Sequence, residues 1–387
     1  MCGFVGFSNF KNNLDTPENI NILKNMNNTL SKRGPDEEGY YTNKNVALGH
    51  KRLIVVDPEN GKQPMIESYS YGDYVIVYNG QIYNTDELSK SLKENGFELN
   101  GHSDTEALLK SYILYGKDVV HKLNGIFGFA IWDEKRKEIF MARDHFGVKP
   151  FFYSILNNTL VFASEIKAIF EYPGIEKVLD SQGIGELLGI GPSHTPGTTI
   201  FKDIFELRPA HFAIFNDSGF HVERYWKLHS EEYKDSLGLT CEKIKYLLND
   251  AITRQLVSDV PLCTFLSGGL DSSIITKFAA DYYQKEGKEL LNTYSIDYVD
   301  NDKNFVKSDF QPNSDNYYIN LMTRNLHVNH HNIVIDTPEL ASYLYDSMIA
   351  RDMPGMADID SSLLLFCKNV KKEMTVSLTG ECADEIF

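Results

Sequence analysis

The chain has 387 residues, of which 42% are hydrophobic and 24% charged, as is ordinary for a soluble globular protein of two or three domains. Its formal net charge of −16 argues against a nucleic-acid-binding surface. No apolar run approaches the roughly 20 residues of a membrane span, and the first residues lack the pattern of a signal peptide. Five scattered cysteines form no CxxC pair, which argues against a zinc site or a disulfide framework and predicts a cytoplasmic protein.

The first part of the chain is predicted to consist of strands and hairpins interrupted by two helices. Apolar or alternating runs predict strands and hairpins over 2–8, 46–57, 74–84, 127–144, 151–165 and 211–226. The hairpin at 151–165 has an Asn-Asn turn. Apolar residues at helical spacing predict helices over 86–96 and 104–116, and Ser103 or Asp104 is the expected N-cap of the second.

After a polar stretch at 227–240, which we interpret as a linker, short apolar strands alternate with helices. Strands are predicted over 260–266, 290–297, 330–336 and 375–380, and helices over 272–287, 338–350 and 360–373. This alternation is typical of a doubly wound parallel sheet, in which ligands bind beyond the carboxyl ends of the strands. The predicted organisation is therefore a first domain over 1–226, the linker, and a second domain over 241–387.

The segment LSGGLDSS, residues 266–273, follows the first strand of the second domain. Its two glycines let backbone amides approach an anion, and the helix that follows adds its positive N-terminal end. The hydroxyls of Ser267, Ser272 and Ser273 add donors. Asp271 would repel a bare phosphate and suits a Mg²⁺ ion better. A Walker A loop is excluded because no GxxxxGK[ST] motif is present, and a Gly-Gly turn capped by serine is the simpler interpretation.

These eight residues resemble the pyrophosphate loop of the ATP-pyrophosphatases, which split ATP into AMP and pyrophosphate to adenylate a substrate. Motifs of the first domain resemble class II glutamine amidotransferases, in the family's order: MCG, RGPDEEG (33–39), GHKRLIVVD (49–57), YNGQIYN (78–84), SDTE (103–106) and RDHFGVKPFFY (143–153). Together the two halves resemble the glutamine-hydrolysing, B-type asparagine synthetases over residues 1–387. The resemblance implies an α/β multidomain protein, with an N-terminal-nucleophile (Ntn) hydrolase four-layer αββα sandwich followed by an ATP-pyrophosphatase sheet.

The resemblance implies that Met1 is removed and that Cys2 becomes the nucleophile of glutamine hydrolysis. A terminal cysteine can use its own α-amine as the base that takes the thiol proton. The thiolate would attack the amide carbon of glutamine, release ammonia and leave a glutamyl thioester for water to hydrolyse. Asn79 and the Gly80 amide would stabilise the oxyanion. The simpler interpretations are a buried thiol on an ordinary first strand and a type I′ turn at Asn79-Gly80.

The same resemblance implies a glutamine pocket. Arg52 would bind the α-carboxylate, since its planar fork suits a carboxylate, and Asp104 would accept from the α-ammonium. The pocket would also be lined by Leu53, Ile54, Val55, Val56, Asn79, Gly80 and Gln81. The family usually has glutamate where Gln81 stands. A surface arginine and a plain N-cap are the simpler interpretations, and Arg33 and Asp36 are expected to support the pocket through an ion pair or a cap. Three nearby histidines are expected to be structural: His50, His102 and His145.

The second domain is expected, by resemblance, to bind ATP with Mg²⁺. The implied ATP-binding residues are Phe265, Ser267, Gly268, Gly269, Asp271, Ser272, Ile296, Thr379 and Gly380. The closing segment LTGECADEIF (378–387) resembles the family's second signature. In it Glu381 would take a proton from ammonia at a β-aspartyl-AMP intermediate, and Asp384 would join Asp271 on the metal. Cys382 stands where many relatives have glycine, and so does Ala210 in the first domain. A helix start rich in acidic residues is the simpler interpretation.

The implied reaction adenylates aspartate with ATP and then replaces AMP by ammonia from glutamine, which gives asparagine. The expected partners are these small molecules, with no nucleic acid or membrane, and a homodimer is a candidate assembly. Three alternatives stay open: a β-lactam-synthetase-like or other amidotransferase with a different acceptor, a glutaminase only, and a non-catalytic sensor of glutamine or nucleotide. Family members continue well beyond Phe387, so we expect a C-terminally truncated chain with a complete glutaminase half and a weak synthetase half. A natural short form is the alternative.

Overall fold

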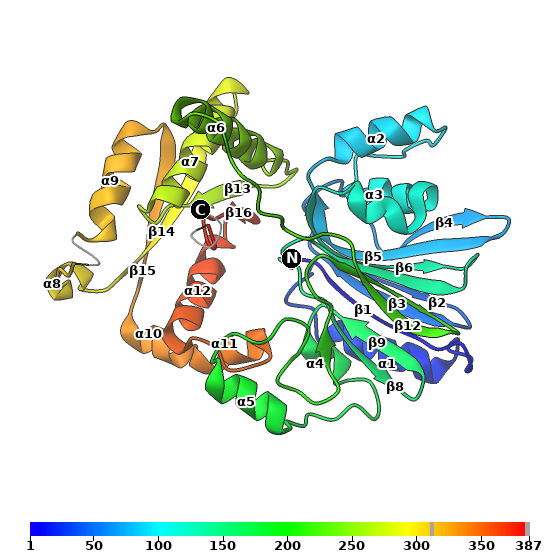
Figure 1. Cartoon of the computed structure of the whole chain (residues 1–387). Coiled ribbons are helices and arrows are strands. Elements are labelled where there is room, and N and C mark those ends of the chain that lie inside the picture. The colour runs from blue at the N-terminus through cyan, green and yellow to red at the C-terminus, as the bar shows by residue number, and fades with distance from the viewer. Residues whose placement is uncertain (310–312, 384–387) are drawn as a thin grey trace. The chain divides into compact units, whose positions relative to one another are not determined.

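The computed structural model describes residues 1–309 and 313–383, and the chain separates into two compact units, Met1–Ser230 and Glu231–Phe387 (Figure 1). Each unit has its own sheets and its own core. The predicted domain boundary at residue 226 stays a prediction. No helix within the described ranges is both long and apolar enough to cross a membrane.

The first unit, whose residues are all described, consists of twelve strands with helices on both sides. The strands are β1 (Gly3–Ser8), β2 (Glu37–Thr42), β3 (Val46–Arg52), β4 (Met65–Tyr69), β5 (Gly72–Ile82), β6 (Gly125–Asp133), β7 (Glu138–Arg143), β8 (Phe152–Leu156), β9 (Thr159–Ala163), β10 (Phe205–Glu206), β11 (His211–Asn216) and β12 (Gly219–Arg224). The helices are α1 (Pro17–Asn28), α2 (Thr85–Glu94), α3 (Asp104–Tyr115), the 3-10 helix η1 (Gly116–His121), α4 (Ile166–Ile169) and α5 (Ser181–Gly189).

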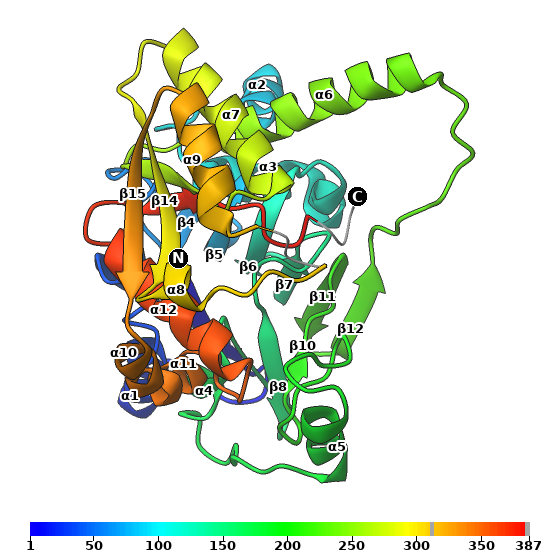
Figure 2. The same ribbon diagram turned by 90° about the vertical axis from the view of Figure 1, so that its left-hand side faces the viewer.

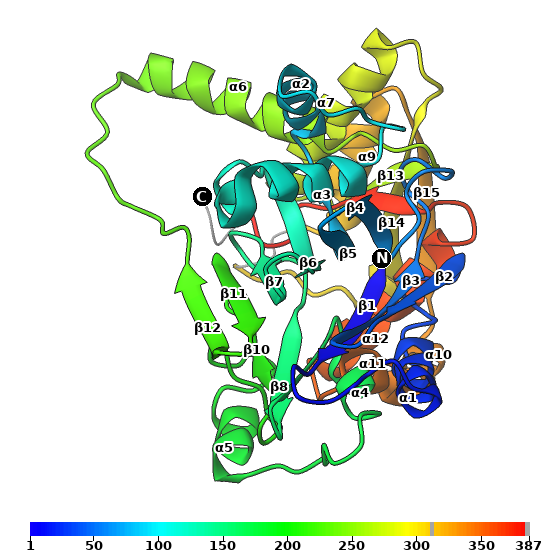
Figure 3. The same ribbon diagram turned by 90° about the vertical axis from the view of Figure 1, so that its right-hand side faces the viewer.

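These strands form two antiparallel sheets that stack face to face. One sheet has the order β10-β8-β9-β1-β3-β2 and the other the order β12-β11-β7-β6-β5-β4. Helices α1 and α4 pack on the first sheet, and α2 and α3 pack on the second (Figure 3). The layers therefore run helix, sheet, sheet, helix, which confirms the αββα arrangement expected from the sequence.

Alternation along β5 distributes its side chains between two cores. Val75 and Val77 enter the core between the sheets, beside Trp132. Ile76 and Tyr78 point the other way and pack in the core under α2 and α3. Successive side chains on a strand face opposite sides, so one strand closes two layers at once.

Local signals decide several elements. The hairpin of β8 and β9 turns at Asn157 and Asn158 with φ of 48° and 62°, as expected for a type I′ turn. Ser103 is the N-cap of α3, because its side chain accepts from the Thr105 amide at 3.2 Å. Helix α1 was not predicted, because its many asparagines and few apolar residues give a weak periodic signal.

The second unit contains four parallel strands among its described residues. They are β13 (Leu262–Phe265), β14 (Leu291–Tyr298), β15 (Val328–Ile335) and β16 (Val376–Leu378). The helices are α6 (Leu237–Arg254), α7 (Leu270–Lys285), α8 (Asn301–Asn304), α9 (Asp315–Asn325), α10 (Thr337–Ser342), α11 (Leu344–Arg351) and α12 (Ala357–Val370). The strand order is β15-β14-β13-β16, and Figure 2 shows β14 and β15 side by side.

Helices cover both faces of this sheet. Leu262 packs with α6 and α7 on one face, whereas its neighbour Cys263 packs with α12 on the other. The doubly wound parallel sheet predicted from the sequence is thus present. Two details differ: α6 begins inside the predicted linker, where Ser236 caps it, and the helix predicted over 338–350 breaks at Tyr343 into α10 and α11.

His50 connects the two sheets of the first unit. It lies on β3, is fully buried, and donates through Nε2 to the Tyr78 carbonyl oxygen on β5 at 3.0 Å. Its Nδ1 has no hydrogen-bond partner among the described residues. Burial lowers the pKa of His50 to about 4, because the charged imidazolium loses its hydration.

We predict that His50 makes the first unit less stable in mild acid. Its pKa is lower in the folded than in the unfolded chain, so its contribution is full above about pH 6.5 and is lost as the pH falls toward 4. The free energy of unfolding should decrease by about 2 kcal/mol from this group between pH 7 and pH 5. His50→Gln should lack this part of the pH dependence. Urea titrations monitored by tryptophan fluorescence report on this unit, because both tryptophans, Trp132 and Trp226, lie in it. Equal pH dependence in both proteins would contradict the prediction.

Candidate active sites

Cys2 immediately precedes β1, which pairs with β3 on one side and β9 on the other. The Leu53 amide donates to Cys2 Sγ at 3.4 Å, and Sγ donates to the Leu53 carbonyl oxygen at 3.5 Å. Burial raises the pKa of the Cys2 thiol above its ordinary value, while the Leu53 amide and the charge of Arg52 oppose this rise. The thiol is therefore held at a fixed place and is mostly protonated at neutral pH with Met1 in place.

Asn79 on β5 lies against the backbone of Cys2. In the amide orientation that satisfies both neighbours, Asn79 Nδ2 donates to the Cys2 carbonyl oxygen at 3.2 Å, and Oδ1 accepts from Arg33 Nη2 at 3.3 Å. Arg33 Nε also donates to the Cys2 carbonyl oxygen at 2.9 Å, and Nη1 pairs with Glu165 at 2.8 Å. The last contact is the supporting ion pair expected of Arg33. An amide nitrogen carries two N–H groups, so Asn79 has a second donor beside Cys2.

The pair Asn79-Gly80 is not a turn. Both residues lie inside β5 and pair with Gly128 and Phe127 of β6. The type I′ interpretation is therefore wrong. A Cβ on Gly80 would lie 2.3 Å from the Ile126 carbonyl oxygen, so glycine is required by the close approach of β6.

The Gly80 amide points away from β6. Amides of alternate residues on a strand face the same side. The Tyr78 amide donates to Gln63 Oε1 at 2.7 Å, and the Ile82 amide donates to Asp104 Oδ2 at 3.1 Å. The Gly80 amide lies between these two and faces the same way. Tyr78 also donates through its hydroxyl to Asp104 Oδ2 at 2.7 Å, and burial raises the pKa of the Asp104 carboxyl.

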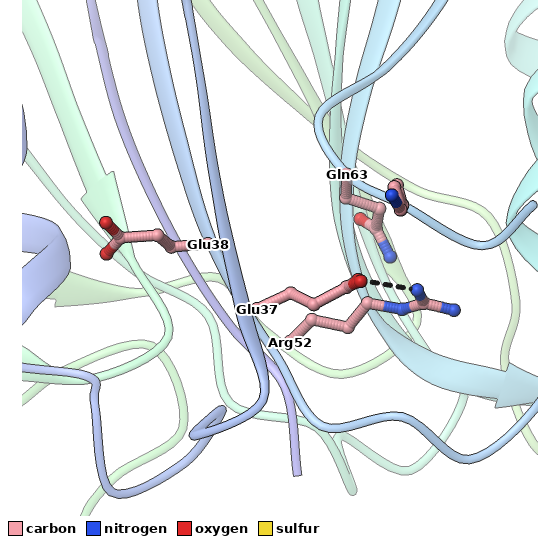
Figure 4. Close-up of a pocket in the computed structure, with 5 residues that line it drawn as sticks. Glu37, Glu38, Arg52 and Gln63 are labelled. Carbon is pink, nitrogen blue, oxygen red and sulfur yellow. Dashed lines mark hydrogen bonds and ion pairs between the residues drawn. The ribbon is translucent and has the colours of Figure 1, made fainter. Parts of the chain in front are cut away.

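Arg52, at the end of β3, is only 4% exposed, and both of its terminal nitrogens are engaged. Nη1 donates to Glu37 Oε2 at 2.7 Å and to the Pro58 carbonyl oxygen at 3.0 Å. Nη2 donates to the carbonyl oxygens of Val56 at 3.3 Å and Asp57 at 2.6 Å. Figure 4 shows Glu37 meeting the guanidinium. A pocket of about 270 Å³ here is lined by Glu37, Glu38, Arg52, Lys62 and Gln63.

The predicted strand over 46–57 ends at Arg52 because the next residues bind elsewhere. The loop Leu53–Val56 is half-buried. The Ile54 amide donates to Asp36 Oδ2 at 2.8 Å, and the Asp36 amide donates to the Arg52 carbonyl oxygen at 3.0 Å. Asp36 thus caps this loop, as expected. Gln81 follows Gly80 on β5 and is half-buried.

The two signatures of the second unit lie at the carboxyl ends of neighbouring strands. Segment 266–273 follows β13 and segment 379–382 follows β16, and these strands pair directly. The strand order reverses at this point, since β14 lies on the other side of β13. A Cβ on Gly380 would lie 2.9 Å from Asp271 Cβ and 2.9 Å from the Ser272 amide nitrogen. Parallel sheets of this kind bind ligands at such a switch point.

Ser272 organises the loop after β13. It is buried, its Oγ accepts from the Ser267 amide at 3.2 Å, and it donates to the Gly269 carbonyl oxygen at 3.2 Å. Gly268 has a φ of 84°, and a Cβ there would lie 3.0 Å from the Asp315 carbonyl oxygen. The loop leads into the sixteen-residue helix α7. The loop therefore lies at the positive N-terminal end of a long helix, where an anion is favoured.

The other predicted residues of the second unit show fewer contacts with the two signatures. Phe265 packs edge-on against Phe366 at 4.6 Å between ring centroids, and Ile296 joins the same cluster on the α12 face. The Glu381 amide donates to Thr379 Oγ1 at 3.2 Å. Asp384 lies outside the described residues. Within the described part of the chain, no three His, Cys, Asp or Glu side chains gather as a metal site.

Comparison with known proteins settles the family. Residues 1–226 match the glutamine amidotransferase domain and residues 243–387 match asparagine synthase. The chain is 51% identical over 387 residues to asparagine synthetase 3 (glutamine-hydrolysing) of Bacillus subtilis, covering 100% of this chain and 63% of that protein. It is 32% identical over 415 residues to the putative asparagine synthetase 2 (glutamine-hydrolysing) of Methanocaldococcus jannaschii, covering 100% of this chain and 75% of that protein.

This chain belongs to the glutamine-hydrolysing asparagine synthetase family. It spans between 52% and 63% of the length of the three B. subtilis relatives. Its first unit is accordingly a glutamine amidotransferase domain with αββα layers, and its second is an α/β parallel sheet. The two positions at which the resemblance led us to expect glycine both have positive φ, 66° at Cys382 and 59° at Ala210. A residue other than glycine is strained there by about 1–2 kcal/mol, which is a physical reason to expect glycine.

Sequence reasoning missed Lys149. It lies in the RDHFGVKPFFY motif, and its Nζ donates to Met1 Sδ at 3.3 Å. Burial and the nearby charge of Arg33 lower the pKa of Lys149 to about 8, while the charges of Asp144 and Cys2 oppose this shift. The sequence does contain a signal for a buried lysine, because Lys149 stands next to the apolar end of this motif.

We predict that Gly380→Ala disturbs the contact between the two signatures. The new methyl group would meet the Ser272 amide at 2.9 Å, so one of the two segments must move. The second unit should lose about 1–3 kcal/mol of its free energy of unfolding, measured by urea titration with circular dichroism. Gly238→Ala on α6 is the matched control, because no atom lies within 4 Å of its added Cβ. Equal stability of the two variants would contradict this contact.

Proposed function

We propose that this chain is an asparagine synthetase that uses glutamine as its nitrogen donor. ATP, L-aspartate, L-glutamine and water would give AMP, diphosphate, L-asparagine and L-glutamate. The observation that carries the proposal is the setting of Cys2. It stands at the start of a buried central strand, with the Asn79 amide and the Gly80 strand edge beside it, in a chain whose second unit joins both nucleotide signatures.

Glutamine hydrolysis begins when removal of Met1 frees the α-amine of Cys2. This amine takes the thiol proton, and the thiolate attacks the amide carbon of glutamine. The negative charge that forms on the amide oxygen is stabilised by the second N–H of Asn79 and by the Gly80 amide. The proton then passes to the leaving ammonia, and water hydrolyses the thioester to glutamate. Contacts of the Cys2 carbonyl oxygen with Arg33 and Asn79 keep the nucleophile in place.

Glutamine is held by its α-substituents. Arg52 binds the α-carboxylate and Asp104 accepts from the α-ammonium. The charges of both residues act on the Cys2 thiol, which supports a common pocket. The backbone of Leu53–Val56 and the side chain of Gln81 line it.

In the second unit the loop 266–273 binds the pyrophosphate part of ATP through its amides and serine hydroxyls. Phe265 and Ile296 contact the adenosine part, and Thr379 with Gly380 approaches AMP. Mg²⁺ commonly combines one or two carboxylates with substrate phosphates, and a single carboxylate, Asp271, at the start of α7 fits that donor set. Asp384 is the second proposed carboxylate. When bound, the ion neutralises phosphate charge.

The aspartate step uses residues of the second signature. Glu381 takes a proton from ammonia as it attacks β-aspartyl-AMP.

The described part of the chain contains all five cysteines, and each is a free thiol, which supports a cytoplasmic location.

We predict that Cys2→Ala lowers ammonia release from glutamine by at least about 1000-fold, because no other group can form the thioester. Ammonia is measured by a coupled glutamate dehydrogenase assay. Cys241→Ala is the matched control, since Cys241 is exposed on α6 and should leave the rate unchanged. Undiminished ammonia release by Cys2→Ala would refute the role of Cys2.

The whole reaction is tested with glutamine that carries ¹⁵N in its side-chain amide, incubated with the chain, aspartate and MgATP. We predict that mass spectrometry finds the label in asparagine, with glutamate and asparagine formed in a ratio near one. Label in free ammonia alone would restrict the activity of this chain to glutamine hydrolysis. Unchanged glutamine would reject the proposal for both units.

A further inference from the structure

The guanidinium of Arg52 already holds a carboxylate. Glu37 Oε2 lies 2.7 Å from Nη1, and the Arg52 side chain is 4% exposed against 30% for Glu37. Three backbone carbonyl oxygens occupy the remaining terminal N–H groups. Because a guanidinium has only five N–H groups, a second carboxylate finds no open two-point contact on the terminal nitrogens. A substrate carboxylate must therefore replace one of these acceptors.

Glu37 is the acceptor most easily replaced. The carbonyl oxygens of Val56, Asp57 and Pro58 belong to a loop whose backbone packs closely, since a Cβ on Gly61 would lie 2.3 Å from Arg52 Nη2. Glu37, by contrast, contacts the guanidinium through its flexible side chain, and this side chain faces the pocket shown in Figure 4. Lys62 lines the same pocket and offers the released carboxylate a cation.

The sheet register fixes this arrangement. Glu37 on β2 stands directly opposite Arg52 on β3, and Glu38 stands opposite Lys51. Opposed residues share a face of the sheet, and the next pair lies on the other face. Glu38 borders the pocket as well, but its carboxylate pairs with Lys51 on that second face and points away from Arg52 in Figure 4.

We propose that Glu37 is an internal competitor for the glutamine site: its carboxylate occupies the place on Arg52 that the α-carboxylate of the substrate takes. This inference rests on the proposed function, in which Arg52 binds that group. Glutamine then binds by exchanging one ion pair for another, and the exchange weakens its net affinity. Product glutamate carries the same α-carboxylate and meets the same competition. The ion pair thus sets the KM for glutamine and leaves the chemistry at Cys2 unchanged.

The test compares Glu37→Gln with the matched variant Glu38→Gln in the full chain. Glu37→Gln keeps the size of the side chain and removes its charge. We expect the KM for glutamine and the inhibition constant of L-glutamate to fall together by about five- to tenfold, with kcat unchanged. This factor corresponds to part of the energy of one charge-assisted hydrogen bond, which the substrate no longer has to displace. Glu38→Gln should stay within about twofold of the original protein, because surface pairs contribute little.

Other outcomes overturn the inference. An unchanged KM would show that Glu37 does not compete, and a raised KM would show that it positions Arg52 for the substrate. If Glu37→Gln fails to give the native tryptophan fluorescence, Glu37→Asp replaces it, and its shorter side chain should lower KM by a smaller factor. Ammonia release that depends on Cys2 in the original protein keeps the proposed function standing in each of these cases. Its absence there would reject the proposed function instead.

Discussion

The first unit depends on the double pairing of β1. Its six residues are all buried, and the strand is hydrogen-bonded to β3 and β9 on its two sides. Phe4 makes two hydrogen bonds with Ser164. The Phe4 amide donates to Ser164 Oγ at 3.0 Å, and the Phe4 carbonyl oxygen accepts from the Ser164 amide. Gly6 has no room for a Cβ, which would lie 2.4 Å from Phe162 Cζ. A residue next to such a strand has little freedom, so the sheet fixes the backbone of Cys2, while the loop residue Leu53 contacts its thiol.

Strand β5 of the facing sheet carries two further predicted residues of that site, Asn79 and Gly80. Its side chains close two cores, and its backbone amides face Gln63 and Asp104 in turn. The charged residues around the thiol have opposite effects on it. Arg52 favours the thiolate, whereas Asp104 and burial favour the thiol. Burial is the largest of these effects, so an α-amine exposed by removal of Met1 would act on a thiol that its surroundings keep protonated.

Much of the fold could be predicted from the sequence, because strands such as β5 and helices such as α3 carry clear periodic patterns. The parallel sheet of the second unit could also be predicted from its alternating elements. Asn79-Gly80 could not be assigned from its own letters, since this dipeptide is equally a turn signal. The glycine is there because the β6 backbone passes 2.3 Å from where a Cβ would stand.

The partner of Arg52 was likewise beyond sequence reasoning. The opposition of Glu37 and Arg52 depends on the register of β2 and β3, and the polar sequence EEGYYT of β2 shows no strand pattern. The broken helix at Tyr343 and the early start of α6 depend on tertiary packing and capping, which local propensity does not determine. The candidate residues taken from family motifs stay predictions, and the structure adds which groups already contact them.

The pairing of β13 with β16 has a consequence for the order of folding. Cys263 Sγ reaches the Val376 carbonyl oxygen at 3.5 Å across 113 residues of sequence. Contacts this distant in the chain form slowly, because a long loop must close before they add stability. The first unit, by contrast, is closed by residue 230. During synthesis from the N-terminus, the surroundings of the thiol can therefore be complete while the nucleotide loop still lacks its neighbouring strand.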